Sequence, residues 1–525
     1  MVKVLISDKM SPLAQQIFEQ RGIDVDFKPG MTPDELKACI GEYHGLAIRS
    51  ATKATAEIIA AADNLKVIGR AGIGVDNVDQ IAATAKGVVV MNTPLGNSIT
   101  TAEHAIAMMM AVARQIPTAN ASTHAGKWEK SRFMGSEVFA KTLGLIGSGN
   151  IGSIVADRAQ GLKMKVITFD PFLSPERAKE MGVEKVELDV LFARADFITM
   201  HTPLTDSTRN LLNADAFAKM KDGVRIINCA RGGIVNEADL AAALDSGKVA
   251  GAALDVFAEE PAKENILFGR DDVVCTPHLG ASTDEAQVNV AIQVAEQMSD
   301  YLLSGAITNA LNMPSVSAED APKLMPYMQL AEQLGSFAGQ VTESGINKVI
   351  IEFEGHVAKL NTRPLLQAAL TGLLKPFSDS VNMVNAPVLA RERSIEVTEI
   401  KHDRPGDYQT LIKLTIVTER MERSISGTLF GGDRPRIIDI KGIAVEAELT
   451  AHMLYVTNED KPGLIGALGS VLGAAGANVA TFHLGRADEG GSALSLIQLD
   501  SAVDEALLGK IQALPHVKKA KALCF

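Results

Sequence analysis

Cysteine is scarce in this chain of 525 residues, and its spacing is irregular. Cys39, Cys229, Cys275 and Cys524 stand far apart and form no CxxC pair. Secreted domains that depend on disulfides, and zinc sites built on paired cysteines, carry denser and more regular patterns. We therefore predict no disulfide framework and no metal site, and the scattered thiols suit a reducing cytoplasm.

Long apolar runs and an excess of positive charge are also missing. No stretch approaches the ~18 consecutive apolar residues of a membrane helix, and the short apolar run after Met1 ends at Asp8, unlike a signal peptide. Asp and Glu number 63 against 51 Lys and Arg, which gives a formal net charge of −12. This balance argues against general binding of nucleic acids or membrane surfaces, and it still allows a local basic pocket.

The chain does contain one glycine-rich motif that favours a nucleotide. Residues 141–152 form an apolar run followed by Gly147, Gly149 and Gly152 at the spacing GxGxxG. Such glycines allow a tight strand-to-helix turn and a close approach of the backbone to a pyrophosphate. Asp170 ends the next apolar segment 23 residues after Gly147, near the ~20 residues expected for a carboxylate that binds ribose hydroxyls. The pattern predicts a nicotinamide cofactor, NAD rather than NADP.

The order of strands and helices predicts an α/β fold with two doubly wound, Rossmann-like parallel sheets. Short apolar strands alternate with helices over residues 1–98, and again after the glycine motif. One long helix is expected at 98–124, and another at 284–304 that carries the chain back to the first sheet. We therefore predict a discontinuous substrate-binding domain, residues 1–98 and 286–312, with the NAD-binding domain, residues 99–285, inserted into it.

Beyond residue 312 the pattern changes to alternating strands with fewer helices. Residues 313–450 predict an α+β intervening domain with an antiparallel sheet, in which segments such as 410–418 are strands. Residues 451–525 follow the order β-α-β-β-α-β, which is ferredoxin-like. A chain of this length is expected to form about three or four domains, so a four-domain division is reasonable.

Residues capable of chemistry follow three strands of the second sheet. They are Arg231 in segment 228–233, Glu260 in segment 255–261 and His278 in segment 275–280. A guanidinium can hold a carboxylate bidentately, and a carboxylate beside an imidazole fixes its tautomer for general base catalysis. Each residue alone has an ordinary structural explanation. Their common place at strand ends of a nucleotide domain favours a dehydrogenase site.

These motifs together resemble the D-isomer-specific 2-hydroxyacid dehydrogenases, and the C-terminal extension resembles that of the long family members that oxidise 3-phosphoglycerate. The segments that carry the resemblance are 69–77, 147–152, 228–233, 255–261 and 276–281. The resemblance implies that Arg231 binds the substrate, that His278 is the acid/base and that Glu260 is the partner of His278. It also implies oxidation of 3-phospho-D-glycerate by NAD to 3-phosphohydroxypyruvate, the first step of L-serine biosynthesis.

The resemblance further implies a set of ligand contacts. Those to the cofactor are Gly147, Gly149, Asn150, Ile151, Gly152, Asp170, Thr202, Ala230, Asp255 and Gly280. Those to the substrate are Arg49, Arg70, Gly72 and Ile73, with Lys130 and Arg132 adding charge across a dimer interface. The arginines would supply the donors that a phosphate and a carboxylate need. Ile73 stands where some relatives carry Thr, so a backbone contact would remain there and a hydroxyl contact would not.

The terminal block resembles an ACT domain, a serine-binding regulatory module. Asn458, Asp460 and Asn478 match its ligand loop and the facing asparagine, and Asp460 would bind the ammonium group of L-serine. The alternative is an ACT-like fold kept only for dimerisation, because a fold alone does not establish a ligand. The resemblance also implies a homo-oligomer, either a dimer or a tetramer.

Two other functions are compatible with the sequence. The first is a dehydrogenase for another small D-2-hydroxy acid, for example a glyoxylate or hydroxypyruvate reductase. The second is a non-enzymatic corepressor that senses NAD, which the intact set of Arg231, Glu260 and His278 disfavours.

Overall fold

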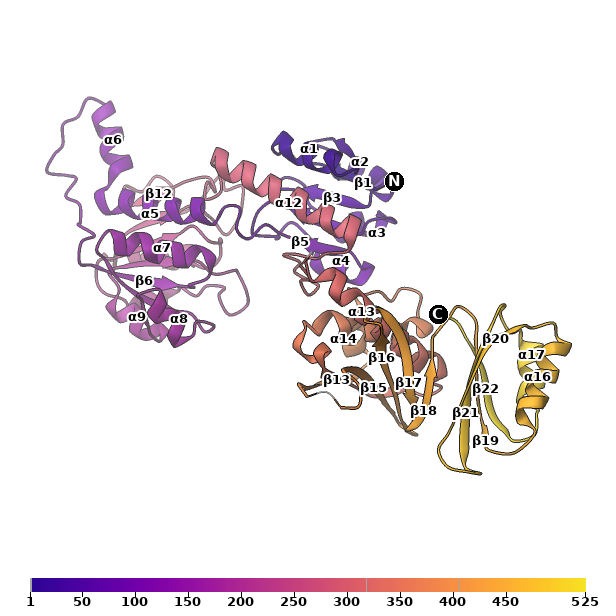
Figure 1. The fold of residues 1–525 in the computed structure, drawn as a ribbon. Helices are drawn as coiled ribbons and strands as arrows, with labels where there is room; N and C mark the ends of the chain where they lie inside the picture. Colours follow the sequence, from indigo (N-terminus) through magenta and orange to yellow (C-terminus); the bar gives the residue numbers. More distant parts are fainter. Residues whose placement is uncertain (1, 318, 405) are drawn as a thin grey trace.

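The computed structural model describes residues 2–317, 319–404 and 406–525. Within these ranges the strands form four sheets, of five, seven, six and four strands. Figure 1 shows two parallel-sheet units, with helix α12 (Asp284–Ser304) running along the first of them, and two further sheets toward the C-terminus. None of the described helices is both long enough and apolar enough to cross a lipid bilayer.

The first sheet is parallel and has the order β2-β1-β3-β4-β5. Its strands are β1 (Lys3–Ile6), β2 (Asp24–Phe27), β3 (Gly45–Ile48), β4 (Val67–Arg70) and β5 (Val89–Met91). Its helices are α1 (Pro12–Gln20), α2 (Pro33–Cys39), α3 (Ala56–Ala61) and α4 (Gln80–Lys86), with a 3-10 turn η1 (Ile40–Glu42). Helix α12 packs on this sheet through Val290, Val294 and Met298. The chain therefore returns to its first sheet after building the second.

The second sheet is parallel and has the order β12-β11-β10-β9-β6-β7-β8. Its strands are β6 (Thr142–Ile146), β7 (Lys165–Phe169), β8 (Glu184–Lys185), β9 (Phe197–Met200), β10 (Val224–Asn228), β11 (Val249–Leu254) and β12 (Val273–Cys275). Its helices include α7 (Asn150–Gly161), α8 (Pro175–Glu180), α9 (Leu188–Arg194), α10 (Ala214–Lys219) and α11 (Glu237–Asp245). The strand order reverses at β6, where doubly wound sheets bind ligands. The predicted pair of Rossmann-like sheets is confirmed.

The single helix predicted for residues 98–124 is wrong, because the chain breaks there into α5 (Ser98–Arg114) and α6 (Ile116–His124). Gln115 between them has a left-handed φ of 52°. Pro117 has no N–H to donate to the carbonyl of Ala113, and that carbonyl accepts from the Ser136 N–H at 2.8 Å instead. The proline therefore ends the first helix and redirects the second.

The third sheet has the order β14-β13-β15-β16-β17-β18. Its strands are β13 (Ile346–Gly355), β14 (Glu396–His402), β15 (Thr410–Thr418), β16 (Glu422–Phe430), β17 (Arg434–Ile440) and β18 (Ile443–Ala447). Its helices are α13 (Ala321–Val341), α14 (Arg363–Leu374) and α15 (Ala386–Glu392), with 3-10 turns η2 (His356–Lys359) and η3 (Lys375–Phe377). The predicted antiparallel sheet is wrong at one edge, where β14 pairs in parallel with β13. The reason is that α14 and α15 lie between these strands and form a crossover connection.

The fourth sheet has the order β20-β21-β19-β22. Its strands are β19 (Met453–Glu459), β20 (Val479–Arg486), β21 (Ser492–Leu499) and β22 (Val517–Leu523), and its helices are α16 (Leu464–Ala474) and α17 (Glu505–Gln512). One face of the sheet packs on these helices. The other face contributes Tyr455, Leu494 and Leu496 to the core of the third sheet, where the Tyr455 ring meets Phe337 edge-on at 5.3 Å. The two C-terminal units therefore share a hydrophobic core.

Candidate active site

The candidate site is the cleft between the two parallel-sheet units. It contains two adjoining cavities of about 660 and 650 Å³, which is the usual size for small-molecule sites. The cavities share Arg70, Asn97, His278 and Ala281 in their walls. The first is lined by Arg49, Gly72 and Glu260, and the second includes Asn150 and Ile151 of the glycine motif. The cleft therefore has room for a small ligand beside a larger one.

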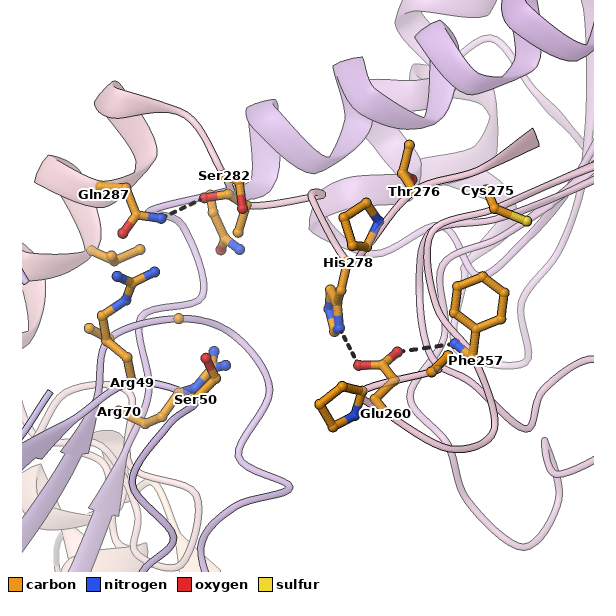
Figure 2. Close-up of a pocket in the computed structure, with 18 of the residues that line it drawn as sticks. Arg49, Ser50, Arg70, Phe257, Glu260, Cys275, Thr276, His278, Ser282 and Gln287 are labelled. Atoms are coloured by element: carbon orange, nitrogen blue, oxygen red, sulfur yellow. Dashed lines mark hydrogen bonds and ion pairs between the residues drawn. The ribbon is translucent and has the colours of Figure 1, made fainter. Parts of the chain in front are cut away.

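His278 and Glu260 form a hydrogen-bonded pair at the wall of the first cavity (Figure 2). His278 Nδ1 lies 2.7 Å from Glu260 Oε2, and Glu260 Oε1 accepts from the Phe257 N–H at 3.0 Å. Burial alone would raise the pKa of Glu260, but the hydrogen bonds from His278 and Phe257 outweigh it and lower that pKa. Because an ionised carboxylate can only accept a hydrogen bond, the proton of the neutral imidazole is placed on Nδ1. The Nε2 atom of His278 is then free to accept a proton.

Two arginines from the first sheet face this pair across the cavity (Figure 2). Arg49 follows β3, and its Nη1 donates to the Lys9 carbonyl at 3.1 Å. Arg70 ends β4, and among the described residues its buried Nε has no hydrogen-bond partner. Burial first, and then the neighbouring Arg231 guanidinium, lower the pKa of Arg70 to about 10. Arg70 therefore stays charged at neutral pH and favours an anion in the cleft.

Arg231 follows β10 of the second sheet and pairs with Asp76 of the first parallel-sheet unit. Its Nε lies 3.0 Å from Asp76 Oδ2, and its Nη1 donates to the Ala230 carbonyl at 2.7 Å. A Cβ on Gly74 would lie 1.7 Å from Nη2 of Arg231, so a larger residue at position 74 would displace the guanidinium. Asp76 is not among the residues predicted from the sequence, although an acid within the glycine-rich segment 69–77 was a usable signal.

The second cavity gathers half of the predicted cofactor residues. Its walls include Asn150, Ile151, Thr202, Ala230 and Gly280, together with Ile73 from the predicted substrate set. Nearby, a Cβ on Gly152 would lie 2.1 Å from the Gly147 carbonyl oxygen, so the turn from β6 into α7 requires glycine there. This turn places the N-terminus of α7 toward the cavity, as a phosphate group would need.

Asp170 lies beside the glycine turn at the carboxyl end of β7. Its Oδ2 accepts from the Ser148 N–H at 2.8 Å and from the Ser148 hydroxyl at 2.9 Å. Burial alone would raise the pKa of Asp170, but these bonds and the Phe172 N–H lower it. The carboxylate is therefore ionised next to the loop that carries Gly147 and Gly149.

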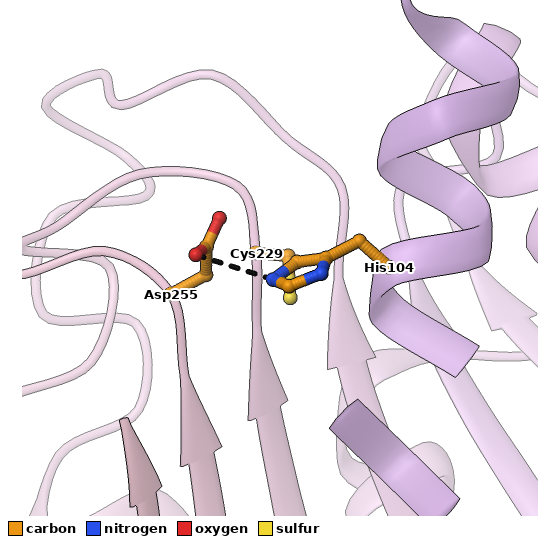
Figure 3. A group of neighbouring side chains, drawn as sticks. All are labelled: His104, Cys229 and Asp255. Atoms are coloured by element: carbon orange, nitrogen blue, oxygen red, sulfur yellow. Dashed lines mark ion pairs between the residues drawn. The ribbon is translucent and has the colours of Figure 1, made fainter. Parts of the chain in front are cut away.

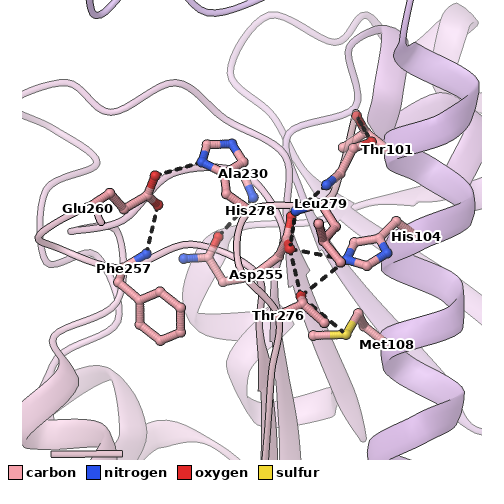
Figure 4. A network of polar contacts seen from close by, with 12 residues as sticks. Thr101, His104, Met108, Ala230, Asp255, Phe257, Glu260, Thr276, His278 and Leu279 are labelled. Carbon is pink, nitrogen blue, oxygen red and sulfur yellow. Dashed lines mark hydrogen bonds and ion pairs between the residues drawn. The ribbon is translucent and has the colours of Figure 1, made fainter. Parts of the chain in front are cut away.

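Asp255 does not line either cavity, and its side chain is 0% exposed. Its Oδ1 accepts from the Leu279 N–H at 2.7 Å and from the Thr276 hydroxyl at 2.6 Å. Its Oδ2 accepts from the Gly280 N–H at 2.8 Å. Asp255 therefore supports the turn that carries His278, as Figure 4 shows.

Asn97 and His201 are cavity residues that the sequence analysis missed. Asn97 lines both cavities and His201 lines the second. Within the described part of the chain, Asn97 Oδ1 and His201 Nδ1 are buried without a hydrogen-bond partner. Burial lowers the pKa of His201 to about 4, so this imidazole is neutral near pH 7. The position of His201, directly before Thr202, was the only signal for it in the sequence.

The remaining predicted residues lie outside the cleft. Lys130 and Arg132 belong to the segment after α6, where Arg132 pairs with Asp271 at 2.6 Å. In the fourth sheet, Asp460 accepts from Arg486 and from the Gly490 N–H, both at 3.1 Å, at one end of β20. Asn478 donates to Asp500 at 2.7 Å at the other end, roughly 23 Å away at ~3.3 Å per residue. One chain therefore does not bring Asn478 to Asp460 or to the buried Asn458.

Comparisons with known proteins agree with this geometry. Residues 106–280 match the model of the D-isomer specific 2-hydroxyacid dehydrogenase NAD binding domain, 323–441 the D-3-phosphoglycerate dehydrogenase intervening domain and 452–516 the ACT domain. A D-3-phosphoglycerate dehydrogenase of Synechocystis sp. is 44% identical, covering 99% of this chain and 94% of the relative. One from Bacillus subtilis is 41% identical, covering 100% and 99%.

The chain belongs to the D-3-phosphoglycerate dehydrogenase family. As a member it is an NAD-dependent dehydrogenase with an ACT domain, so the predicted family, enzyme class and cofactor are confirmed. A solved D-lactate dehydrogenase of Aquifex aeolicus, in complex with NAD and lactic acid, matches with a TM-score of 0.53 and 25% identity. That match covers 60% of this chain and 100% of the solved chain.

The neutral His201 predicts an acid-sensitive NAD-binding unit. The unfolded chain binds a proton at this histidine near pH 6.5, whereas the folded chain does so only near pH 4, so stability is lost as the pH falls between these values. From pH 7 to pH 5 the free energy of unfolding should fall by about 2 kcal/mol through this group. Urea unfolding at both pH values should show that loss reduced in His201→Gln and kept in the exposed control His124→Gln. Equal losses in all three proteins would contradict the assignment.

Proposed function

We propose that this chain oxidises 3-phospho-D-glycerate to 3-phosphohydroxypyruvate with NAD. The observation that carries the proposal is the convergence of Arg49, Arg70 and Arg231 on the cleft that holds His278 and Glu260. The substrate has both a carboxylate and a phosphate, and several guanidiniums are needed to bind the two groups. The names of the relatives that match over their full length support the same substrate.

The chain's own residues would divide the chemistry as follows. Arg231 holds the carboxylate of the substrate and polarises the C2 oxygen, and Arg49 and Arg70 bind the phosphate. His278 accepts the C2 hydroxyl proton at Nε2, and Glu260 stabilises the imidazolium through Nδ1. NAD, when bound, accepts the hydride from C2. These roles require C2 of the substrate to lie close to His278, which lines both cavities.

Several residues fit the cofactor. The glycine turn leaves the backbone between Gly147 and Gly152 open to a pyrophosphate. Thr202, whose buried hydroxyl lacks a partner among the described residues, and Ala230 line the neighbouring cavity. The ionised Asp170 would bind ribose hydroxyls and repel a 2′-phosphate. Asp255 would act indirectly, because it is buried beneath the turn that contains Gly280.

We propose the same domain division as the sequence suggested, supported by the two parallel sheets and by the return of α12 to the first.

We also propose that the chain forms a homo-oligomer and that L-serine is the effector of the ACT domain. Because Asn478 and Asp460 lie at opposite ends of β20, one serine pocket would need Asn478 from a second copy. Four free cysteines support a cytoplasmic location.

The first test compares substrates. Initial rates with NAD should give a kcat/KM for 3-phospho-D-glycerate far above that for D-glycerate. Arg49→Gln should raise the KM for the phosphorylated substrate about 10- to 100-fold, since a charge-assisted hydrogen bond contributes ~1.5–3 kcal/mol, and should hardly change D-glycerate oxidation. Arg21→Gln, whose side chain pairs with Asp300 on the same unit, is the control. No preference for the phosphate would favour another small D-2-hydroxy acid.

The second test concerns the base. His278→Gln should lower kcat by about 10²- to 10⁴-fold, because no group is left to accept the hydroxyl proton. Binding of NADH, followed by its fluorescence, should stay within a factor of a few of the unaltered enzyme. A variant that keeps its kcat would remove His278 from this role.

The third test concerns cofactor choice. Asp170→Asn keeps an acceptor for Ser148 and removes the negative charge, so the ratio of kcat/KM for NAD over NADP should fall about tenfold, equivalent to ~1.4 kcal/mol. Asp157→Asn, an exposed change on α7, should leave the ratio as it is. An unchanged ratio in Asp170→Asn would show that the charge does not exclude NADP.

A further inference from the structure

One face of α5 supports the turn that carries the base (Figure 4). We call residues 276–280 the catalytic turn. Thr101 donates its hydroxyl to the Gly280 carbonyl at 2.8 Å. His104, one helical turn further on, places its Nε2 3.2 Å from Asp255 Oδ1 and 3.3 Å from the Thr276 hydroxyl. Residues three apart lie on the same helical face, so α5 contacts both ends of the catalytic turn.

Asp255 connects this helix to His278. Its backbone carbonyl accepts from the His278 N–H at 2.9 Å, and its carboxylate binds Thr276, Leu279 and Gly280 as described above. His278 has a left-handed φ of 54°, which a residue with a Cβ adopts only when its surroundings impose it. The Asp255 hydrogen bonds on both sides of His278 impose that backbone.

His104 keeps the Asp255 carboxylate charged in a fully buried place. Burial alone would raise the pKa of Asp255, and the hydrogen bond from His104 is the strongest of those that lower it instead. A buried carboxylate that loses a donor is left with a desolvation cost that no hydrogen bond offsets. Without His104, the carboxylate would be expected to shift toward another donor or to take up a proton, and the catalytic turn would move with it.

A metal ion is the alternative use of this cluster. His104, Cys229 and Asp255 have possible ligand atoms within 4.8 Å of one another (Figure 3). Burial first, and then the Asp255 charge, raise the pKa of the Cys229 thiol, whereas a metal requires the thiolate. Both Asp255 oxygens already accept hydrogen bonds. The cluster is therefore better suited to hold a carboxylate than to bind a metal.

We infer that His104 is a positioning residue, which acts through Asp255 to set the catalytic turn and so the place of His278 relative to Glu260 and the substrate. The inference rests on the proposed function for the choice of assay. It predicts that the imidazole is needed as a hydrogen-bond donor at Nε2. It also predicts an effect on turnover rather than on substrate affinity, because Arg49, Arg70 and Arg231 lie on other elements.

The test uses three variants of the full chain. His104→Leu removes the donor and should lower kcat about 10- to 100-fold, the loss expected for a displacement of ~1 Å, with the KM for 3-phospho-D-glycerate changed less than about threefold. His104→Gln, whose amide nitrogen can replace Nε2, should recover most of the kcat. Glu103→Gln, on the exposed side of the same helix, is the matched control and should equal the unaltered enzyme.

Three outcomes would overturn the inference. They are an unchanged kcat in His104→Leu, a His104→Gln variant as slow as His104→Leu, and loss of activity on dialysis against EDTA that Zn²⁺ restores. If His104→Leu fails to fold by circular dichroism, Thr101→Val replaces it and should lower kcat through the Gly280 carbonyl. An unaltered enzyme inactive on 3-phospho-D-glycerate would refute the proposed function alone, and the variants would then be compared on whichever D-2-hydroxy acid it oxidises.

Discussion

The buried Asp255 carboxylate is the constraint on which the site depends. It is 0% exposed, and a buried charge costs several kcal/mol unless hydrogen bonds compensate it. The donors come from α5 and from the turn after β12, with Asp255 itself at the end of β11. Because the donors belong to two segments and the carboxylate to a third, satisfying this one carboxylate fixes three segments together. His278 lies in the middle of the turn that results.

Basic side chains gather in the cleft although the chain as a whole is acidic. The chain has a net charge of −12, yet Arg49, Arg70 and Arg231 lie close enough to lower the pKa of Arg70 together with its burial. In the described residues only Asp76 pairs with Arg231, and it does so from the other unit. An anionic ligand would therefore both relieve the repulsion and bind residues of both units, which links substrate binding to the relative position of the two sheets.

The C-terminal half shows a different kind of coupling. The third and fourth sheets share a core that includes Phe337 and Tyr455, so apolar packing joins them. Lys519 of β22 also pairs with Glu343, just after α13, at 2.7 Å. The residues that match a serine site stand at two ends of the fourth sheet, so the proposed serine pocket would need a second copy of the chain. A regulatory signal would then pass through packed apolar contacts.

The sequence alone determined the two parallel sheets, the glycine turn and the chemistry-bearing residues, because glycine spacing, hydrophobic periodicity and strand-end polar residues are local signals. Local signals could not show that β14 pairs in parallel with β13, because that pairing depends on a partner distant in the chain. The division of the helix at Pro117 did have a local signal, since a proline interrupts a helix. The site shows the same limit. Arg231, Glu260 and His278 could be named in advance, but Asn97 and His104 matter only through contacts across the fold. Burial and pairing of charges are tertiary properties, and they decided which residues support the cleft.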